Sequence, residues 1–229
     1  MIKAVFFDLG RTLVLPASND WYFTPLFYRL VPQITPDAIR REPVQSAFRK
    51  AYQPLLEYPR TRDVPHQITR FTAFYDALLD NCGIPHDESL PRILAEDHAG
   101  NMNNMVLVPT ARETLHALHE AGIWLGVISD TWPMIMDQLR ALQIHQYFDA
   151  FTLSYELGTN KPSPAMFHDA LSKASLPPHQ CLFVDDVAEY LRIAEEFRIP
   201  AIQSVPDDTV IRDDRYPCIR CPAEILPYL

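Results

Sequence analysis

The amino-acid sequence predicts an α/β protein, with a Rossmann-like parallel sheet core and an inserted α-helical cap domain. Short apolar runs alternate with amphipathic helical stretches through the second half of the chain, as in a parallel sheet. A long interval after the first apolar run lacks β-branched runs and carries apolar residues at helical spacing. The 229 residues suffice for a core and a smaller inserted domain.

The short apolar runs are the predicted core strands. They cover residues 4–7, 124–128, 151–153 and 181–184, with 201–202 as a candidate fifth strand. The amphipathic stretches between the later runs are residues 134–142, 165–174 and 188–197. Because crossovers between parallel strands are right-handed, we expect helices on both faces and all carboxyl strand ends at one edge. Open α/β sheets bind their ligands at that edge.

The helical cap is predicted over residues 15–106, which leaves residues 1–14 and 107–229 for the core. Apolar residues at helical spacing support this prediction: Phe23, Phe27, Leu30, Phe71, Phe74, Leu78 and Leu79. Prolines are expected to separate the helices, namely Pro32, Pro36, Pro43, Pro54, Pro65, Pro85 and Pro91. The core resumes near Thr110, which with Glu113 matches the capping box of a helix start.

The charge of the chain favours a small-molecule partner. A formal net charge of −9 and a pI near 5.3 disfavour binding to a nucleic acid. The apolar run before Asp8 is too short for a signal peptide, and no stretch reaches the roughly 18 apolar residues of a membrane span. We therefore expect a cytoplasmic protein with a small phosphorylated substrate and no nucleic-acid or membrane partner. The sequence leaves its oligomeric state open.

The four cysteines are Cys82, Cys181, Cys218 and Cys221. In a reducing compartment they are expected to be free thiols. The last two form a lone CxxC without a second ligand pair or a redox context, so we interpret them as packing residues.

Four short polar segments lie at or just beyond the ends of predicted strands. They are residues 7–12 (Phe-Asp-Leu-Gly-Arg-Thr), 128–131 (Ile-Ser-Asp-Thr), 158–162 (Gly-Thr-Asn-Lys-Pro) and 183–186 (Phe-Val-Asp-Asp). In this order they resemble the haloacid dehalogenase superfamily. Its members have a strand ending in a nucleophilic aspartate, a strand ending in Ser or Thr, a lysine that opens a helix, and a strand ending in paired acids. The resemblance covers the core on both sides of the insertion, leaves the cap unmatched, and implies a hydrolase.

The chemistry of these residues agrees with the resemblance. A carboxylate at a strand end, beside a cation and opposite a lysine, stays ionised and can attack phosphorus or carbon, so Asp8 is the predicted nucleophile. Ser129 is predicted to donate its hydroxyl to a phosphoryl oxygen, and Lys161 to neutralise charge on the transferred group. The predicted substrate-binding residues are Leu9, Gly10, Arg11, Ser129, Asp130 and Lys161.

The paired acids predict a Mg²⁺ cofactor. Asp186, with Asp185 behind it, offers the hard oxygen ligands that Mg²⁺ prefers. Asp8 and the backbone carbonyl of Gly10 complete the predicted metal ligands. Each of these residues alone could be a helix cap or a solvated side chain, but their joint occurrence at strand ends indicates one shared site.

Position 10 departs from the superfamily pattern. Superfamily phosphatases usually carry a second aspartate there as general acid and base, a role worth about 10²- to 10⁴-fold in rate that Gly10 cannot perform. A sub-branch with Asp-x-Gly-x-Thr or Val, which contains sugar-phosphate phosphatases, resembles this chain. We therefore predict a phosphatase of small phosphate monoesters that forms an aspartyl-phosphate on Asp8. Arg11, His66 and His98 are the candidates for the missing acid.

Two alternatives stay open. The first is a phosphonate hydrolase or another carbon-centre hydrolase, since these also lack the second aspartate. Lys50, the only lysine in the insertion, could then form a Schiff base. The paired acids Asp185 and Asp186 argue against dehalogenation, which needs no metal. The second alternative is a catalytically impaired, phosphate-binding regulatory protein, and the retained catalytic residues argue against it.

Overall fold

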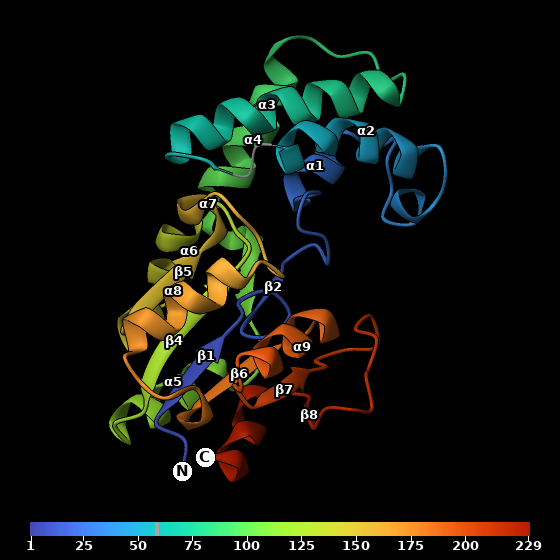
Figure 1. Cartoon of the computed structure of the whole chain (residues 1–229). Helices are drawn as coiled ribbons and strands as arrows, with labels where there is room; N and C mark the ends of the chain where they lie inside the picture. Colours follow the sequence, from blue (N-terminus) through green and yellow to red (C-terminus); the bar gives the residue numbers. More distant parts are fainter. Residues whose placement is uncertain (58–59) are drawn as a thin grey trace. The chain divides into compact units, whose positions relative to one another are not determined.

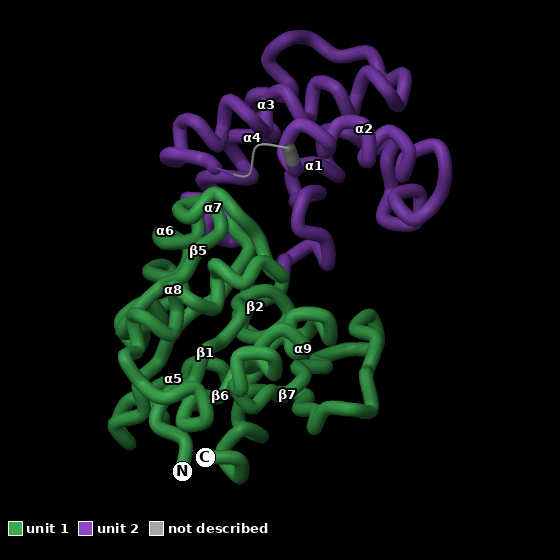
Figure 2. Tube along the Cα trace, viewed as in Figure 1, with its two compact units in different colours: residues 1–15, 105–131, 135–229 green, residues 16–104, 132–134 purple. Residues whose placement is uncertain are grey.

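A computed structural model describes residues 1–57 and 60–229 of the chain, which divide into two compact units (Figure 2). Unit 1 consists of Met1–Leu15, Met105–Thr131 and Ile135–Leu229. Unit 2 consists of Pro16–Asn104 together with Trp132–Met134. No sequence pattern predicts that this three-residue segment, which follows Ser129 closely in the chain, belongs to unit 2.

The core of unit 1 is a six-stranded sheet whose strand pairs are all parallel, in the order β5-β4-β1-β6-β7-β8 (Figure 1). Its strands are β1 (Ala4–Phe7), β4 (Trp124–Ser129), β5 (Ala150–Leu153), β6 (Cys181–Asp185), β7 (Ala201–Ser204) and β8 (Cys218–Ile219). The predicted fold class is therefore confirmed. The two-residue β8 was not predicted.

Helices pack on the sheet through the apolar residues that their sequences space at helical period. α8 (Pro164–Ala174) lies against β4 and β5, and α9 (Ala188–Glu196) against β6 and β7 (Figure 1). Both contribute to one buried cluster, in which the Phe167 and Phe183 rings meet edge-on with centroids 5.4 Å apart. α5 (Ala111–Glu120) contacts β4 and the C-terminal 3₁₀ helix η5 (Pro222–Tyr228). These helices hold the central strands in place, which fixes the strand ends.

Shorter elements complete unit 1. They are α6 (Ile135–Ala141), α7 (Ser154–Leu157), η3 (His145–Tyr147) and η4 (Pro178–Gln180). A separate two-stranded sheet pairs β2 (Val14–Pro16), where the chain leaves the core, with β3 (Met105–Leu107), where it returns. The four cysteines are free, with Cys218 in β8 and Cys221 just before η5.

The capping box predicted at Thr110 is wrong. Thr110 precedes α5 with a left-handed backbone (φ 69°), and its side chain makes no capping hydrogen bond to that helix. Its hydroxyl instead accepts a hydrogen bond from the backbone N–H of Ala223, 3.1 Å away. The Thr110 hydroxyl therefore bonds to the C-terminal segment, which is distant in sequence, and not to the first turn of α5 as in a capping box.

Unit 2 is helical. It contains α1 (Pro25–Leu30), η1 (Ala38–Arg40), α2 (Val44–Glu57), α3 (Val64–Asn81), α4 (Ser89–Gly100) and η2 (Met102–Asn104). All of the apolar residues predicted at helical spacing are buried except Leu30, which is 42% exposed. None of the helices described is both long and apolar enough to cross a membrane.

The prolines of unit 2 do not all separate helices. Pro65 lies in the first turn of α3, where a missing N–H costs nothing. Pro54, expected between helices, lies inside α2. Near it, the guanidinium of Arg70 donates to the carbonyls of Pro54 and Leu55, at 3.2 Å each. α3 thus supplies partners for carbonyls in the last turn of α2, which have no donor within their own helix.

Candidate active site

Lys161 joins the ends of the two central strands. Phe7 of β1 pairs with Val184 of β6, so Asp8 and Asp185 follow side by side. The Lys161 Nζ atom lies 2.7 Å from Asp8 Oδ1 and 2.6 Å from Asp185 Oδ2. Lys161 is only 4% exposed, which excludes a solvated surface lysine.

The charge of Lys161 is fixed by these carboxylates. Burial alone lowers the pKa of an ammonium, but Asp185 and Asp8 outweigh that effect and raise the Lys161 pKa above its ordinary value. Burial raises the pKa of Asp185, and the contact with Lys161 opposes that rise. The ammonium therefore stays charged across the physiological pH range.

Three carboxylates gather at this place. Asp8, Asp185 and Asp186 each offer an oxygen atom within 4.8 Å of the others. With three carboxylates ionised and one ammonium in contact, the group carries a charge of −3 + 1 = −2. Burial and then the charge of Asp8 raise the Asp186 pKa to about 6, and Lys161 and Arg11 oppose that rise.

This donor set fits a hard divalent cation. Carboxylate oxygens are what Mg²⁺ prefers, and a charge of +2 would balance the cluster. Both oxygens of Asp185 already accept hydrogen bonds, from Lys161 Nζ and from the backbone N–H of Val187 at 2.8 Å. Asp8 and Asp186 are therefore the stronger candidates to hold the ion, and Asp185 orients Lys161.

A tight loop carries the chain past Asp8. The Leu9 carbonyl accepts N–H bonds from Thr12, Leu13 and Val14, and Gly10 forms an isolated bridge with Val14. Arg11 has a left-handed backbone (φ 55°), a conformation that costs a non-glycine residue roughly 1 kcal/mol. Its guanidinium donates to Thr209 Oγ1 and lies 3.6 Å from Asp207, so the neighbouring loop engages this side chain.

The other two predicted segments are tied to each other. Ser129 ends β4 beside β1 and is 3% exposed. The side chain of Asp130 accepts a hydrogen bond from the backbone N–H of Lys161 at 2.9 Å. The N–H of Thr131 donates to Ser154 Oγ at the same distance. The structure thus brings Asp8, Asp185, Asp186 and Lys161 into one cluster and anchors the Ser129 segment to the Lys161 loop.

Aromatic rings also contact Lys161, and these contacts were not predicted from the sequence. Nζ lies 4.8 Å from the ring centroid of Tyr190 and 5.8 Å from that of Phe183. A cation over an aromatic face is attracted by the ring quadrupole. Tyr190 lies in the first turn of α9, shortly after the paired acids. An aromatic residue so close in sequence to the paired acids is the feature from which its contact with Lys161 could have been predicted.

The candidates for a replacement acid in unit 2 have different surroundings. His98 is buried, and its ring stacks on Phe71 with centroids 4.1 Å apart. Burial lowers the His98 pKa to about 4, so the imidazole is neutral near pH 7. His66 Nδ1 accepts a hydrogen bond from the backbone N–H of Arg62 at 3.2 Å. Lys50, the candidate for a Schiff base in a phosphonate hydrolase, lies exposed on α2.

Comparisons with known proteins agree on one family. A family model described as haloacid dehalogenase-like hydrolase matches residues 2–189. Haloacid dehalogenase-like hydrolase domain-containing protein 3 of Xenopus laevis is 36% identical over 99 residues, which are 43% of this chain and 40% of that protein. A glyceraldehyde 3-phosphate phosphatase of Pyrococcus abyssi is 27% identical over 188 residues, covering 81% of this chain and 74% of the phosphatase.

Solved structures share the fold. The L-2-haloacid dehalogenase from Xanthobacter autotrophicus superposes with a TM-score of 0.68, covering 100% of this chain and 98% of the dehalogenase, at 17% sequence identity. At that identity the likeness concerns the fold alone.

Proposed function

Because the chain belongs to the haloacid dehalogenase-like hydrolase family, we propose that it is a Mg²⁺-dependent phosphatase of small phosphate monoesters, with Asp8 as nucleophile. The observation that carries this proposal is the buried Lys161 ammonium held between Asp8 and Asp185, with Asp186 beside them. A nucleophilic carboxylate, a fixed positive charge and a set of cation ligands are what transfer of a phosphoryl group to an enzyme carboxylate needs.

In the first step an oxygen of Asp8 attacks phosphorus, the bond from phosphorus to the ester oxygen breaks with its electron pair on that oxygen, and an aspartyl-phosphate forms while the alkoxide departs and takes a proton from water. In the second step water attacks that phosphorus, which restores the Asp8 carboxylate and releases inorganic phosphate. Lys161 neutralises charge on the phosphoryl oxygens, and the Ser129 hydroxyl and the backbone N–H of Gly10 donate hydrogen bonds to them. Asp185 keeps Lys161 in place, since their atoms lie 2.6 Å apart. Mg²⁺ held by Asp8 and Asp186 would add positive charge at the same oxygens.

Gly10 shapes the proposed substrate range. It offers no proton to the departing oxygen, so substrates with good leaving groups should react fastest. The relative from Pyrococcus abyssi is named a glyceraldehyde 3-phosphate phosphatase, which supports small sugar phosphates as the substrate class. We infer that unit 2 acts as the cap that chooses among them.

A substrate screen tests the proposal. Purified protein is assayed for release of phosphate from an aryl phosphate, several sugar phosphates and a phosphonate, and for halide release from a 2-haloacid, with and without Mg²⁺. We expect Mg²⁺-dependent hydrolysis of the phosphate monoesters, lost in Asp8→Asn and kept in Asp137→Asn, an exposed carboxylate paired with Arg140 on α6. Hydrolysis of the phosphonate or the haloacid alone, or full activity in Asp8→Asn, would contradict the proposal.

A further inference from the structure

A buried glutamine at the end of β7 contacts the acidic strand end. Gln203 is fully buried, and its amide nitrogen donates to the carbonyl of Asp186 at 3.0 Å and to that of Ile211 at 2.9 Å. Its amide oxygen accepts from the backbone N–H of Asp213 at 2.8 Å. The ladder between β6 and β7 ends at the Asp185–Gln203 pair, so the side chain extends the contact between these strands to Asp186.

The next residue along β7 contacts the loop of the nucleophile. Ser204 is 3% exposed, and its hydroxyl donates to the carbonyl of Arg11 at 2.8 Å. Arg11 lies directly after Gly10, in the tight loop that begins at Leu9. Two consecutive side chains of one strand therefore hold the backbone on both sides of the carboxylate cluster.

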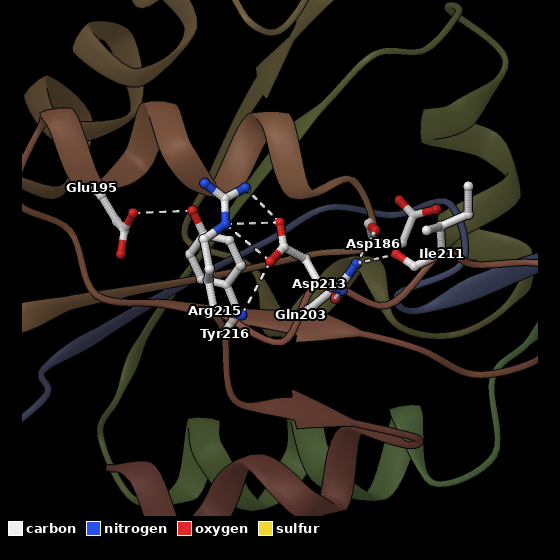
Figure 3. A network of polar contacts seen from close by, with 7 residues as sticks. All are labelled: Asp186, Glu195, Gln203, Ile211, Asp213, Arg215 and Tyr216. Carbon is white, nitrogen blue, oxygen red and sulfur yellow. Dashed lines mark hydrogen bonds and ion pairs between the residues drawn. The ribbon is translucent and has the colours of Figure 1, made fainter.

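The segment after β7 is held by the same glutamine. Figure 3 shows the amide of Gln203 pointing toward Asp186 and Ile211, with Asp213, Arg215 and Tyr216 of the following segment nearby. Asp213 pairs with Arg215, and the hydroxyl of Tyr216 donates to Glu195 of α9 at 3.0 Å (Figure 3). The contacts of the Gln203 amide with Ile211 and Asp213 hold it in place, so it has little freedom to turn away from Asp186.

We propose that Gln203 and Ser204 are positioning residues for the cation site, because they hold the backbone carbonyls of Asp186 and Arg11 at the separation that lets Asp8 and Asp186 bind one ion. This role rests on the proposed function. Neither residue touches the ion or the substrate. Groups that orient metal ligands in this way commonly change metal affinity or activity by about 10- to 100-fold when they are replaced.

The test compares cation binding in three variants and a control. Gln203→Leu keeps similar bulk and removes all three hydrogen bonds, Ser204→Ala removes one, and Ser204→Thr restores a hydroxyl. Thr152→Val is the matched control, because Thr152 lies buried on β5, an edge strand that is not a neighbour of β7, and the change removes the bond from its hydroxyl to Asp169 of α8. Binding of Mn²⁺ is followed by the spectroscopic signal of the free ion. The Mg²⁺ concentration for half-maximal phosphatase rate is measured separately from kcat at saturating Mg²⁺.

We expect Gln203→Leu to weaken Mn²⁺ binding and raise the half-maximal Mg²⁺ concentration about tenfold or more, with kcat at saturating Mg²⁺ nearly unchanged. Ser204→Ala should shift both in the same direction by less, and Ser204→Thr and Thr152→Val should match the wild type. If Gln203→Leu does not fold, the Ser204→Ala and Ser204→Thr pair decides the question.

Two other results would overturn the inference, and they are distinguishable. If Asp186→Asn loses Mn²⁺ binding while folded Gln203→Leu and Ser204→Ala bind like the wild type, the positioning role is wrong and the proposed function stands. If the wild-type protein binds no Mn²⁺, both the positioning role and the proposed cation-dependent function are wrong.

Discussion

Protonation of His98 should destabilise unit 2 in mild acid. The ring is buried, Nε2 lies 3.1 Å from the Trp21 carbonyl, and Nδ1 has no hydrogen-bond partner among the residues described. Burial lowers the His98 pKa from 6.5 to about 4. A neutral ring with its proton on Nε2 satisfies the Trp21 carbonyl, whereas protonation of Nδ1 would add a buried positive charge and an N–H without an acceptor.

The sign and size of the effect follow from this shift. Between pH 6.5 and 4 the unfolded chain binds a proton at His98 that the folded chain does not, so the free energy of unfolding falls as the pH falls through this window. At about 1.36 kcal/mol per pKa unit, the full loss is about 3 kcal/mol, and most of it is present by about pH 4.5. The stability is fully retained above pH 6.5.

Urea unfolding followed by tryptophan fluorescence measures the effect, because Trp21 and Trp132 both belong to unit 2. We expect the wild type to lose about 2 to 3 kcal/mol more than His98→Phe between pH 7 and about pH 4.5. His116→Gln, an exposed histidine on α5, is the matched control and should behave like the wild type. Equal pH dependence in wild type and His98→Phe would show that protonation of the buried His98 ring does not destabilise the protein.

Substitutions at three positions of the site test it further. Lys161→Met should abolish turnover and lower the free energy of unfolding by about 3 to 5 kcal/mol, because it leaves buried carboxylates unpaired. The same change at the partly exposed Lys173 should do neither, as activity assays and denaturation curves would show. Tyr190→Phe should keep kcat, whereas Tyr190→Leu should lower it roughly fivefold through loss of about 1 kcal/mol of ring attraction to Lys161; equal rates in both would exclude that contact from catalysis. Gly10→Asp should raise the rate most for poor leaving groups, and an unchanged ratio between aryl and sugar phosphates would show that another group supplies the proton.

The sequence alone predicted the strands and helices that have a clear local apolar pattern, and the site residues whose positions follow from the order of the strands. The predicted strands match the observed ones within one residue at each end, except that β7 extends two residues beyond position 202. The three core helices likewise agree within one residue. Short apolar runs indicate the buried strands, and apolar residues at helical period indicate the helices. The expectation that strand-end residues meet followed from parallel topology, and Asp8 and Asp185 follow one another side by side at the ends of β1 and β6. Lys161 was expected just beyond a strand end, but α7 separates it from β5, and its Nζ nevertheless lies 2.7 Å from Asp8 Oδ1.

The features that sequence reasoning missed depend on partners distant in the chain. Thr110 fits a local capping rule, yet its hydroxyl bonds to Ala223. Gln203 has no motif around it, and its contact with Asp186 comes from a neighbouring strand. The segment Trp132–Met134 joins unit 2 through contacts such as the Met134 N–H to Gln67 at 3.1 Å. A periodic sequence pattern does not predict such distant hydrogen bonds, because a side-chain amide or hydroxyl can find a hydrogen-bond partner in many local settings.

The roles of the site residues stay predictions, and Asp8 is central to them. The most direct measurement mixes the protein with a radiolabelled phosphate monoester and Mg²⁺, stops the reaction in acid within one turnover, and maps the labelled peptide by mass spectrometry. The account predicts one phosphoryl group on the peptide that contains Asp8, absent from Asp8→Asn. Turnover in the wild type with the label on another residue, or with no labelled peptide at any time within the turnover, would contradict it.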